Sequence, residues 1–192
     1  PVTETAGQIL LPLKLNRRGP SLAVGELDSG TSEIVAIGGT TQTRASILAR
    51  TSTGIFAEID TAAMMPVSSV DDGPLLFLDA NGDGKEDLLV TKGGNALPSG
   101  ATELQPKLYL GDGKGGFRPA PDGMLPALTT SIGAVAAADF DHSGRLGVFL
   151  GGRVLTGQYP YAPTSTLWAN RGGKFEDITD AAAPGLREVG MV

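Results

Sequence analysis

Three times along this chain a short apolar run leads into a loop of acidic and small polar residues, and then into a second apolar run. The three segments read LAVGELDSGTSEIV from Leu22, LLFLDANGDGKEDLLV from Leu75 and VAAADFDHSGRLGVFL from Val135. Each run is shorter than an ordinary helix, and none sustains the apolar period of about 3.6 residues that a helix needs. The pattern therefore predicts two β-strands joined by a tight loop, repeated along the chain.

A second landmark follows each pair of strands: a glycine-rich hairpin that ends in phenylalanine. The hairpins reach Phe56, Phe117 and Phe175, and prolines stand after them at positions 66, 126 and 184. Loops, hairpins and prolines keep one order at a spacing of about 60 residues, which is the signature of a repeat protein. Each unit then has four strands, and we expect little helix.

A repeated four-stranded unit of this length is typical of a β-propeller blade, with the apolar first strand innermost. We expect an all-β fold of about three four-stranded antiparallel blades, because three units are present. Their predicted bounds are 1–66 for blade 1 with an N-terminal strand, 67–126 for blade 2, 127–184 for blade 3, and 185–192 for the lead-in to a further blade. Since propellers close with about four to eight blades, we expect the chain to be part of a larger propeller of about six to eight blades or of an assembly.

Composition narrows the class of partner. The 192 residues include 28 glycines and 13 prolines, which suit many turns, and 41% apolar residues, which suffice for a packed core. The absence of cysteine excludes disulfides and thiolate metal sites. With a net charge of −6 and no basic stripe, nucleic acid is not an expected partner. No apolar run reaches the roughly 20 residues of a membrane span.

The second acidic loop has the pattern of a calcium site. Asp79, Asn81, Asp83 and Asp87 place side-chain oxygens at positions one, three, five and nine, with glycine at position six and Lys85 offering its backbone carbonyl. Calcium takes six to eight oxygen ligands in flexible geometry, and alternate residues of a tight loop can aim oxygens at one point. The sequence predicts structural Ca²⁺ here, and the alternative is an Asp- and Asn-rich turn that binds only its own backbone.

The third loop has a weaker form of the same pattern. Asp139, Asp141 and Ser143 keep oxygens at positions one, three and five, and Arg145 stands at the backbone-carbonyl position. Gly147 replaces the closing carboxylate, so we leave open whether this loop holds calcium, at lower affinity, or is metal-free.

Two other stretches predict no ligand. The first loop, residues 26–33, is one residue short of the pattern and has Gly30 at position five, which favours a metal-free turn. Residues 111–116 match GxGxxG, but a dinucleotide site needs a helix directly after this motif. Phe117-Arg-Pro119 follows instead, so a hairpin turn explains these glycines.

A DxDxDGxxD-type loop between apolar strands, followed by a GxF hairpin on a period of about 60 residues, resembles the FG-GAP or VCBS repeats of integrin-α-like propellers. The resemblance spans residues 20–184. It implies that the loops bind calcium structurally, that Asp79, Asn81, Asp83, Lys85 and Asp87 are ligands, and that the propeller is extracellular, on a cell surface or periplasmic.

The function favoured by these features is a calcium-binding propeller module for protein interaction, assembly or cell-surface scaffolding. Its partner is another protein or further blades of the same propeller, and oligomers are expected. Two alternatives stay open, a propeller-type carbohydrate-active lyase or hydrolase and a structural subunit of a large complex. An enzyme would need converging carboxylates not used for calcium, and Glu58, Glu103 and Asp177 show no common spacing.

Overall fold

The computed structural model describes residues 20–27 and 32–192, and these form three four-stranded antiparallel sheets, each with its strands in chain order. Blade 1 comprises β1 (Leu22–Glu26), β2 (Glu33–Ile37), β3 (Ser46–Arg50) and β4 (Phe56–Ile59). Blade 2 comprises β5 (Asp72–Leu78), β6 (Asp87–Lys92), β7 (Lys107–Gly111) and β8 (Phe117–Pro119). Blade 3 comprises β9 (Ser131–Ala138), β10 (Gly147–Val154), β11 (Thr166–Asn170) and β12 (Phe175–Asp177).

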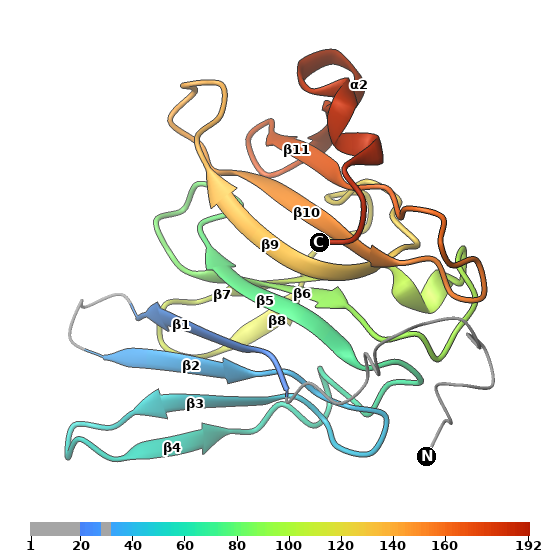
Figure 1. The fold of residues 1–192 in the computed structure, drawn as a ribbon. Helices are drawn as coiled ribbons and strands as arrows, with labels where there is room; N and C mark the ends of the chain where they lie inside the picture. Colours follow the sequence, from blue (N-terminus) through green and yellow to red (C-terminus); the bar gives the residue numbers. More distant parts are fainter. Residues whose placement is uncertain (1–19, 28–31) are drawn as a thin grey trace.

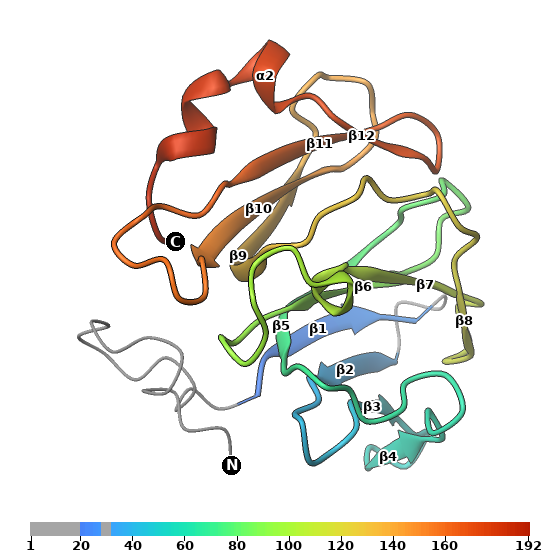
Figure 2. The same cartoon turned by 90° about the vertical axis from the view of Figure 1, so that its right-hand side faces the viewer.

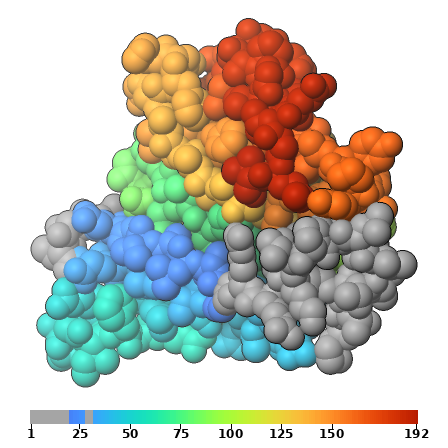
Figure 3. All heavy atoms as spheres, viewed as in Figure 1, coloured from blue at the N-terminus to red at the C-terminus, as the bar shows by residue number. Residues whose placement is uncertain are grey.

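The sheets lie one after another as an open fan (Figures 1 and 2). The first strands of consecutive blades contact each other, β1 with β5 and β5 with β9. In space-filling form these strands follow one another in blue, green and yellow-orange across one side of the molecule (Figure 3). The predictions of an all-β fold, of four-stranded antiparallel blades and of innermost first strands are confirmed, and the sheets described here do not close into a ring.

Two apolar cores hold the fan together, one in each gap between blades. The core between blades 1 and 2 includes Ile34, Ile47, Leu88 and Tyr109. The core between blades 2 and 3 centres on the fully buried Trp168. Tyr109 and Trp168 hold the same place in their sheets, opposite Leu88 in one and Val148 in the other. Both aromatic side chains therefore pack between blades.

Close approach near the innermost strands requires a glycine in β1. A Cβ atom placed on Gly25 would lie 2.8 Å from Cγ of Phe77 in β5. Because both atoms belong to packed strands, the clash could be relieved only by moving one blade away from the other.

A buried ion pair marks the joint between blades 1 and 2. The Lys92 ammonium pairs with Asp72, and both side chains are 6% exposed. The other carboxylate oxygen of Asp72 accepts a hydrogen bond of 2.7 Å from the Gly39 N–H, and the Asp72 N–H donates to the Gly39 carbonyl at 2.9 Å. Both carboxylate oxygens of Asp72 therefore have a partner, which helps to offset the cost of burying the ion pair.

The described helices are short. One is η2 (Thr102–Leu104) in blade 2, and the others are α2 (Thr179–Ala182) and η3 (Pro184–Glu188) after the last strand. Helices α2 and η3 pack against β11. Beyond them, the Val192 N–H donates to the Gly152 carbonyl at 2.9 Å, as the Asp72 N–H does to Gly39. Residues 185–192, predicted as a lead-in to a further blade, thus run over blade 3.

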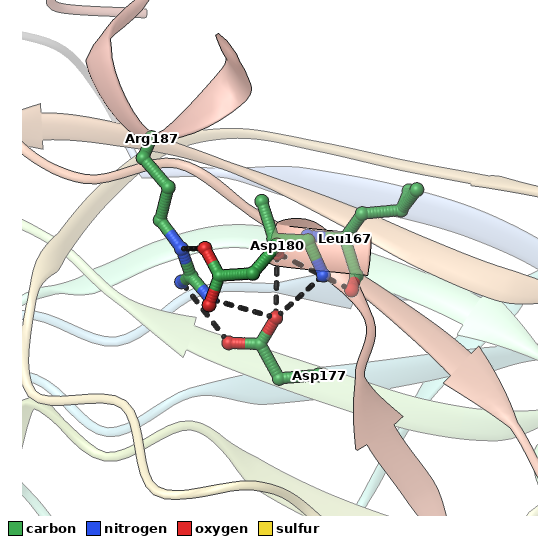
Figure 4. Close-up of polar contacts among 5 residues, drawn as sticks. Leu167, Asp177, Asp180 and Arg187 are labelled. Atoms are coloured by element: carbon green, nitrogen blue, oxygen red, sulfur yellow. Dashed lines mark hydrogen bonds and ion pairs between the residues drawn. The ribbon is translucent and has the colours of Figure 1, made fainter. Parts of the chain in front are cut away.

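Arg187 fixes this helical segment to blade 3 (Figure 4). Its guanidinium donates to both Asp177 and Asp180 at 2.9–3.2 Å. Burial alone would raise the pKa of Asp177, but hydrogen bonds from Thr179 and Arg187 outweigh it and lower that pKa overall. Asp177 is therefore a structural anion that joins β12 to the segment behind it.

Candidate metal-binding loops

The acidic loops connect the first and second strands of each blade, and the strand register aligns them. Leu78 pairs with Asp87, Ala138 with Gly147, and Gly25 with Ile34. In blade 1 the strands pair one step further, at Glu26 and Glu33, so the loop between paired residues is shorter than in the other two blades. The ninth position of this first loop is occupied by Ile34, which is fully buried in the core and brings no oxygen. Residues 28–31 of this loop lie outside the described residues.

Asp79 organises the loop of blade 2. One of its carboxylate oxygens accepts from the N–H groups of Gly82 at 2.7 Å and Asp83 at 3.2 Å, and the other accepts from Gly84 at 2.9 Å. Gly82 and Gly84 have φ near +80°, a region that residues with a Cβ rarely adopt. These hydrogen bonds wrap the chain around the carboxylate of Asp79.

Asn81 and Asp83 continue the turn with contacts to the backbone and to each other. The side-chain oxygen Oδ1 of Asn81 accepts from the Asp83 N–H at 2.8 Å, and the Asp83 carboxylate accepts from the Lys85 N–H at 3.0 Å. The Asn81 amide also donates to Asp83 at 3.2 Å. Asp83 is exposed, and Asn81 and Lys85 are half-buried, so this side of the loop faces solvent.

Asp87 is the most buried of the predicted ligands, with no exposed surface. Its two carboxylate oxygens accept from the N–H groups of Ala80 at 3.0 Å and Gly111 at 2.8 Å. Burial raises the pKa of Asp87, its two backbone hydrogen bonds oppose the rise, and the charges of Asp83 and Asp79 add to it. The carboxylates of the loop therefore repel one another.

Their neighbour Glu86 adds to the negative charge. Its pKa is raised by burial first, and then by the charges of Glu26 in blade 1, Asp79 and Asp87. Among the described residues no lysine or arginine forms an ion pair with Glu26, Glu86 or the loop aspartates at positions 79, 83 and 87. The loop of blade 2 thus concentrates negative charge, and the described residues supply no ion pair to its carboxylates.

The donor set of this loop fits a hard cation. Each carboxylate oxygen carries two lone pairs, so the Asp79 oxygen that accepts only the Gly84 N–H and the two Asp87 oxygens each retain one lone pair for a metal. Carboxylate, amide and backbone carbonyl oxygens are calcium ligands. Within the described part of the chain, no three acidic or histidine side chains already converge as a preformed metal site. Binding would therefore require the side chains to turn toward the ion.

A contact from the next blade supports the loop, and the sequence reasoning missed it. Asn170, at the end of β11, is 3% exposed, and its amide donates to the Ala80 carbonyl at 2.9 Å. Its side-chain oxygen accepts from the Gly173 N–H at 2.9 Å. Asn170 is 90 positions from Ala80. The contact between Asn170 and Ala80 could have been predicted only by assuming that the hairpin of each blade lies beside the acidic loop of the preceding blade.

The loop of blade 3 starts in the same way as that of blade 2. Asp139 accepts from the N–H groups of Ser143 and Gly144, each at 2.9 Å. Asp141 accepts from the Ser143 N–H at 3.2 Å and pairs with Arg171 at 2.8 Å. Hydrogen bonds from Ser143 and Arg171 lower the pKa of Asp141. Arg145 donates through Nε to the Asn170 carbonyl at 3.0 Å, so its side chain points to β11.

The closing position differs between the two loops for a steric reason. A Cβ atom on Gly147 would lie 2.6 Å from the Phe140 ring and 2.7 Å from the Trp168 carbonyl oxygen. At the position equivalent to Phe140, the loop of blade 2 has Ala80, whose small side chain leaves room for Asp87. The sequence shows that Ala80 and Asp87 of blade 2 correspond to Phe140 and Gly147 of blade 3. Only the structure shows that the Phe140 ring occupies the space that a side chain at position 147 would need.

The carboxylates considered for an enzyme do not come together. Glu58 lies on β4 and contacts Ser46 and Arg44, Glu103 lies in η2 beside Thr102, and Asp177 pairs with Arg187. They belong to three different blades, each with its own local contact. The GxGxxG stretch at 111–116 connects two antiparallel strands, with Gly111 opposite Phe117, so the predicted hairpin is confirmed.

Comparison with known families agrees with this geometry. Residues 79–150 match the family described as FG-GAP-like repeat. The match begins at Asp79 and ends in β10, so it includes both loops. A search of curated proteins found no match. Within the described residues, no helix is long and apolar enough to cross a membrane. Residues 79–150, which include the loops of blades 2 and 3, are thus similar to an FG-GAP-like repeat, in agreement with the resemblance seen in the sequence.

Proposed function

We propose that this chain is a propeller module whose blade 2 is stabilised by a calcium ion and which serves protein interaction and assembly. The observation that carries the calcium site is the set of carboxylates in the loop of blade 2, which repel one another and lack an ion-pair partner among the described residues. Asp79, Asn81, Asp83 and Asp87 would hold the ion together with the Lys85 carbonyl.

The chemistry of these groups favours calcium over other metals. Every candidate donor is an oxygen, which suits hard cations, whereas zinc and copper sites in proteins commonly use histidine or cysteine. Magnesium demands near-ideal octahedral geometry, which a flexible loop of carboxylates does not impose. A bound calcium would supply positive charge between the carboxylates, and the loop would keep its turn between β5 and β6.

The expected gain in stability is modest. Calcium sites of extracellular modules bind with Kd of about 10⁻⁴ to 10⁻³ M. At a free calcium concentration of about ten times Kd, one ion that binds only the folded chain adds about 1.4 kcal/mol to the free energy of unfolding. Such affinities are useful where calcium is millimolar. We therefore place the module outside the cytoplasm, at a cell surface, in the extracellular medium or in the periplasm.

Thermal unfolding with and without calcium tests this proposal. The Tm of the unmodified chain should fall in a chelator and recover with calcium but not with equal magnesium. Asp83→Ala should remove the calcium response, because Asp83 is exposed and belongs to the predicted ligands. Asp112→Ala is the matched control, since Asp112 also accepts two backbone N–H groups in a turn but lies outside the loop. An Asp83→Ala chain with the parent's calcium response would refute the site.

A further inference from the structure

A small pocket lies at the joint between blades 1 and 2, away from the acidic loops. Its walls come from the β2–β3 loop and the segment after β4 in blade 1, and from β5, β6 and β7 in blade 2. Asp72 at the start of β5 pairs with Lys92 at the end of β6, whereas Leu78 at the other end of β5 precedes the acidic loop. The pocket therefore lies at the end of blade 2 opposite the proposed calcium site (Figure 1).

Cations dominate the lining of this pocket, although the chain as a whole has a net charge of −6. Arg44, Lys92 and Lys107 line it, and Asp72 is the one carboxylate among the lining residues. Glu58, outside the lining, offsets part of this charge through a contact of 3.5 Å with Arg44. A concave site with an excess of positive charge attracts anions.

Two buried donors in the pocket have unused hydrogen-bonding capacity. The Lys92 ammonium has three N–H donors and its side chain is 6% exposed, yet Asp72 is its one partner among the described residues. Tyr109 is 4% exposed, and no hydrogen bond joins its hydroxyl to another residue in the described part of the chain. Because buried donors are costly to leave without a partner, both groups favour an acceptor inside the pocket.

Lys107 adds a cation that is free to approach a ligand. It is exposed at the start of β7, and it forms no ion pair within the ranges 20–27 and 32–192. Binding an anion would therefore not require Lys107 to give up a carboxylate partner.

The size of the pocket limits what it can hold. Its volume is about 80 Å³. Since one water needs about 10 to 15 Å³, the pocket has room for several waters or for one compact polar group, and not for a nucleotide.

We infer that this pocket binds a carboxylate group, with the Lys92 ammonium, the Tyr109 hydroxyl and the Lys107 ammonium as donors. A carboxylate accepts about four hydrogen bonds, which suits several donors around a compact space. A phosphate dianion would be repelled by Asp72 about twice as strongly as a carboxylate. The group belongs either to a free small acid or to an acidic side chain of a peptide, and the inference does not depend on calcium.

Amide NMR titrations of the 192-residue chain in chelator, at constant ionic strength, test the pocket. The ligands are acetate and a blocked Gly-Asp-Gly peptide, and the controls are chloride, phosphate and blocked Gly-Asn-Gly. Saturable shifts should appear at Gly39, Lys92 and Tyr109 with the carboxylates. Tighter binding of the peptide would identify an acidic side chain as the source, and equal or tighter binding of acetate a free acid. The inference is overturned if neither carboxylate shifts these amides, or if the controls shift them equally.

Two substitutions test whether the named donors bind the carboxylate. Tyr109→Phe should weaken binding about two- to tenfold, as expected for one neutral hydrogen bond. Lys107→Ala should weaken it about two- to fivefold, as expected for an exposed ion pair. Lys114→Ala is the matched control, because Lys114 is exposed in the β7–β8 hairpin outside the pocket. Circular dichroism checks folding. Affinities unchanged in both pocket variants, or lowered equally by Lys114→Ala, would contradict the assignment.

Discussion

Blades 2 and 3 have the same loop in the same place, yet they close it in different ways. Asp79 and Asp139 each accept the N–H groups that form the turn. At the closing position blade 2 has a buried carboxylate that binds two backbone N–H groups, and blade 3 has glycine beneath a phenylalanine ring. The same turn can therefore be closed by hydrogen bonds to a carboxylate, as in blade 2, or by packing against an aromatic ring, as in blade 3. Only the closing position of blade 2 carries a negatively charged side chain.

The two blades also differ in how the charge of the loop is balanced. Arg171 of blade 3 pairs with Asp141. Asn170 pairs with Phe175 in blade 3, and Gly111 pairs with Phe117 in blade 2, so Arg171 is equivalent to Asp112. The Asp112 carboxylate accepts hydrogen bonds from backbone N–H groups of its own turn. Blade 3 thus supplies its own cation, whereas blade 2 increases its negative charge. If the proposed calcium site of blade 2 is correct, this contrast predicts that an external cation stabilises blade 2 more than blade 3.

The largest effect is expected when the closing aspartate of blade 2 is introduced at the equivalent position of blade 3. Gly147→Asp should destabilise the chain by about 3 to 5 kcal/mol, because the new side chain overlaps Phe140 and the Trp168 carbonyl. Phe140→Ala in the same chain should recover a large part of the loss, since it recreates the small residue of Ala80. Urea unfolding measures both, and equal stabilities of the single and double variants would contradict the steric account.

Removing the closing carboxylate from blade 2 should cost somewhat less. Asp87→Ala leaves the N–H groups of Ala80 and Gly111 without their acceptor. We expect a loss of about 3 kcal/mol in the free energy of unfolding, the sum of two hydrogen bonds to a charged group less the repulsion relieved. Asp122→Ala, an exposed acid at a joint, should change stability by less than about 0.5 kcal/mol. Similar losses in both variants would argue against a structural role of Asp87.

The aromatic residues at the equivalent position of β7 and β11 predict a pH dependence that only blade 2 contributes. Burial, and then the charge of Asp72, raises the pKa of Tyr109 to about 12. Its contribution to stability is fully present below pH 10 and is lost as pH rises through the folded-state value. The loss approaches about 2.7 kcal/mol, from two pKa units at about 1.36 kcal/mol each. Trp168 does not titrate.

Alkaline unfolding of the parent and of Tyr109→Phe measures this dependence. The variant should lose less stability than the parent between pH 10 and 12, because phenylalanine cannot ionise. If both chains follow the same curve, the phenol of Tyr109 is not the group responsible.

The smallest expected effect concerns Arg171. Arg171→Gln removes a partly exposed ion pair, so the free energy of unfolding should change by less than about 1 kcal/mol. The variant should also make the loop of blade 3 more like that of blade 2, because Asp141 then has no ion-pair partner, like Asp79 among the described residues. We expect a larger rise of Tm with calcium than in the parent, and an unchanged calcium response would mean that Arg171 does not compete with the ion.

Repetition in the sequence was sufficient to predict the blades. The hairpin phenylalanines stand at the first residue of β4, β8 and β12, and the acidic loops lie between the first two strands of each sheet. Period, turn residues and apolar runs are local properties of the chain, and they specify strands and hairpins without knowledge of the packing.

Contacts between blades were beyond such reasoning. Pairing of Gly25 with Ile34 places an apolar residue at the ninth position of the first loop, and only the strand register shows this alignment. The Asn170 contact with Ala80 and the Arg171 contact with Asp141 depend on how two sheets or two hairpins meet. A single sequence lists the side chains in order along the chain, but it does not say which of them face each other across a gap between sheets.

The amide of Asn170 has a consequence for how such repeats can be divided. All predicted ligands of the blade 2 loop lie within residues 79–87, yet the carbonyl of the loop's second residue is held from β11. A fragment cut at the joint after blade 2 would retain every ligand and lose this support. Binding measured on an isolated repeat would then understate that of the intact fan, and the affinity of each loop would be tuned by the blade that follows it.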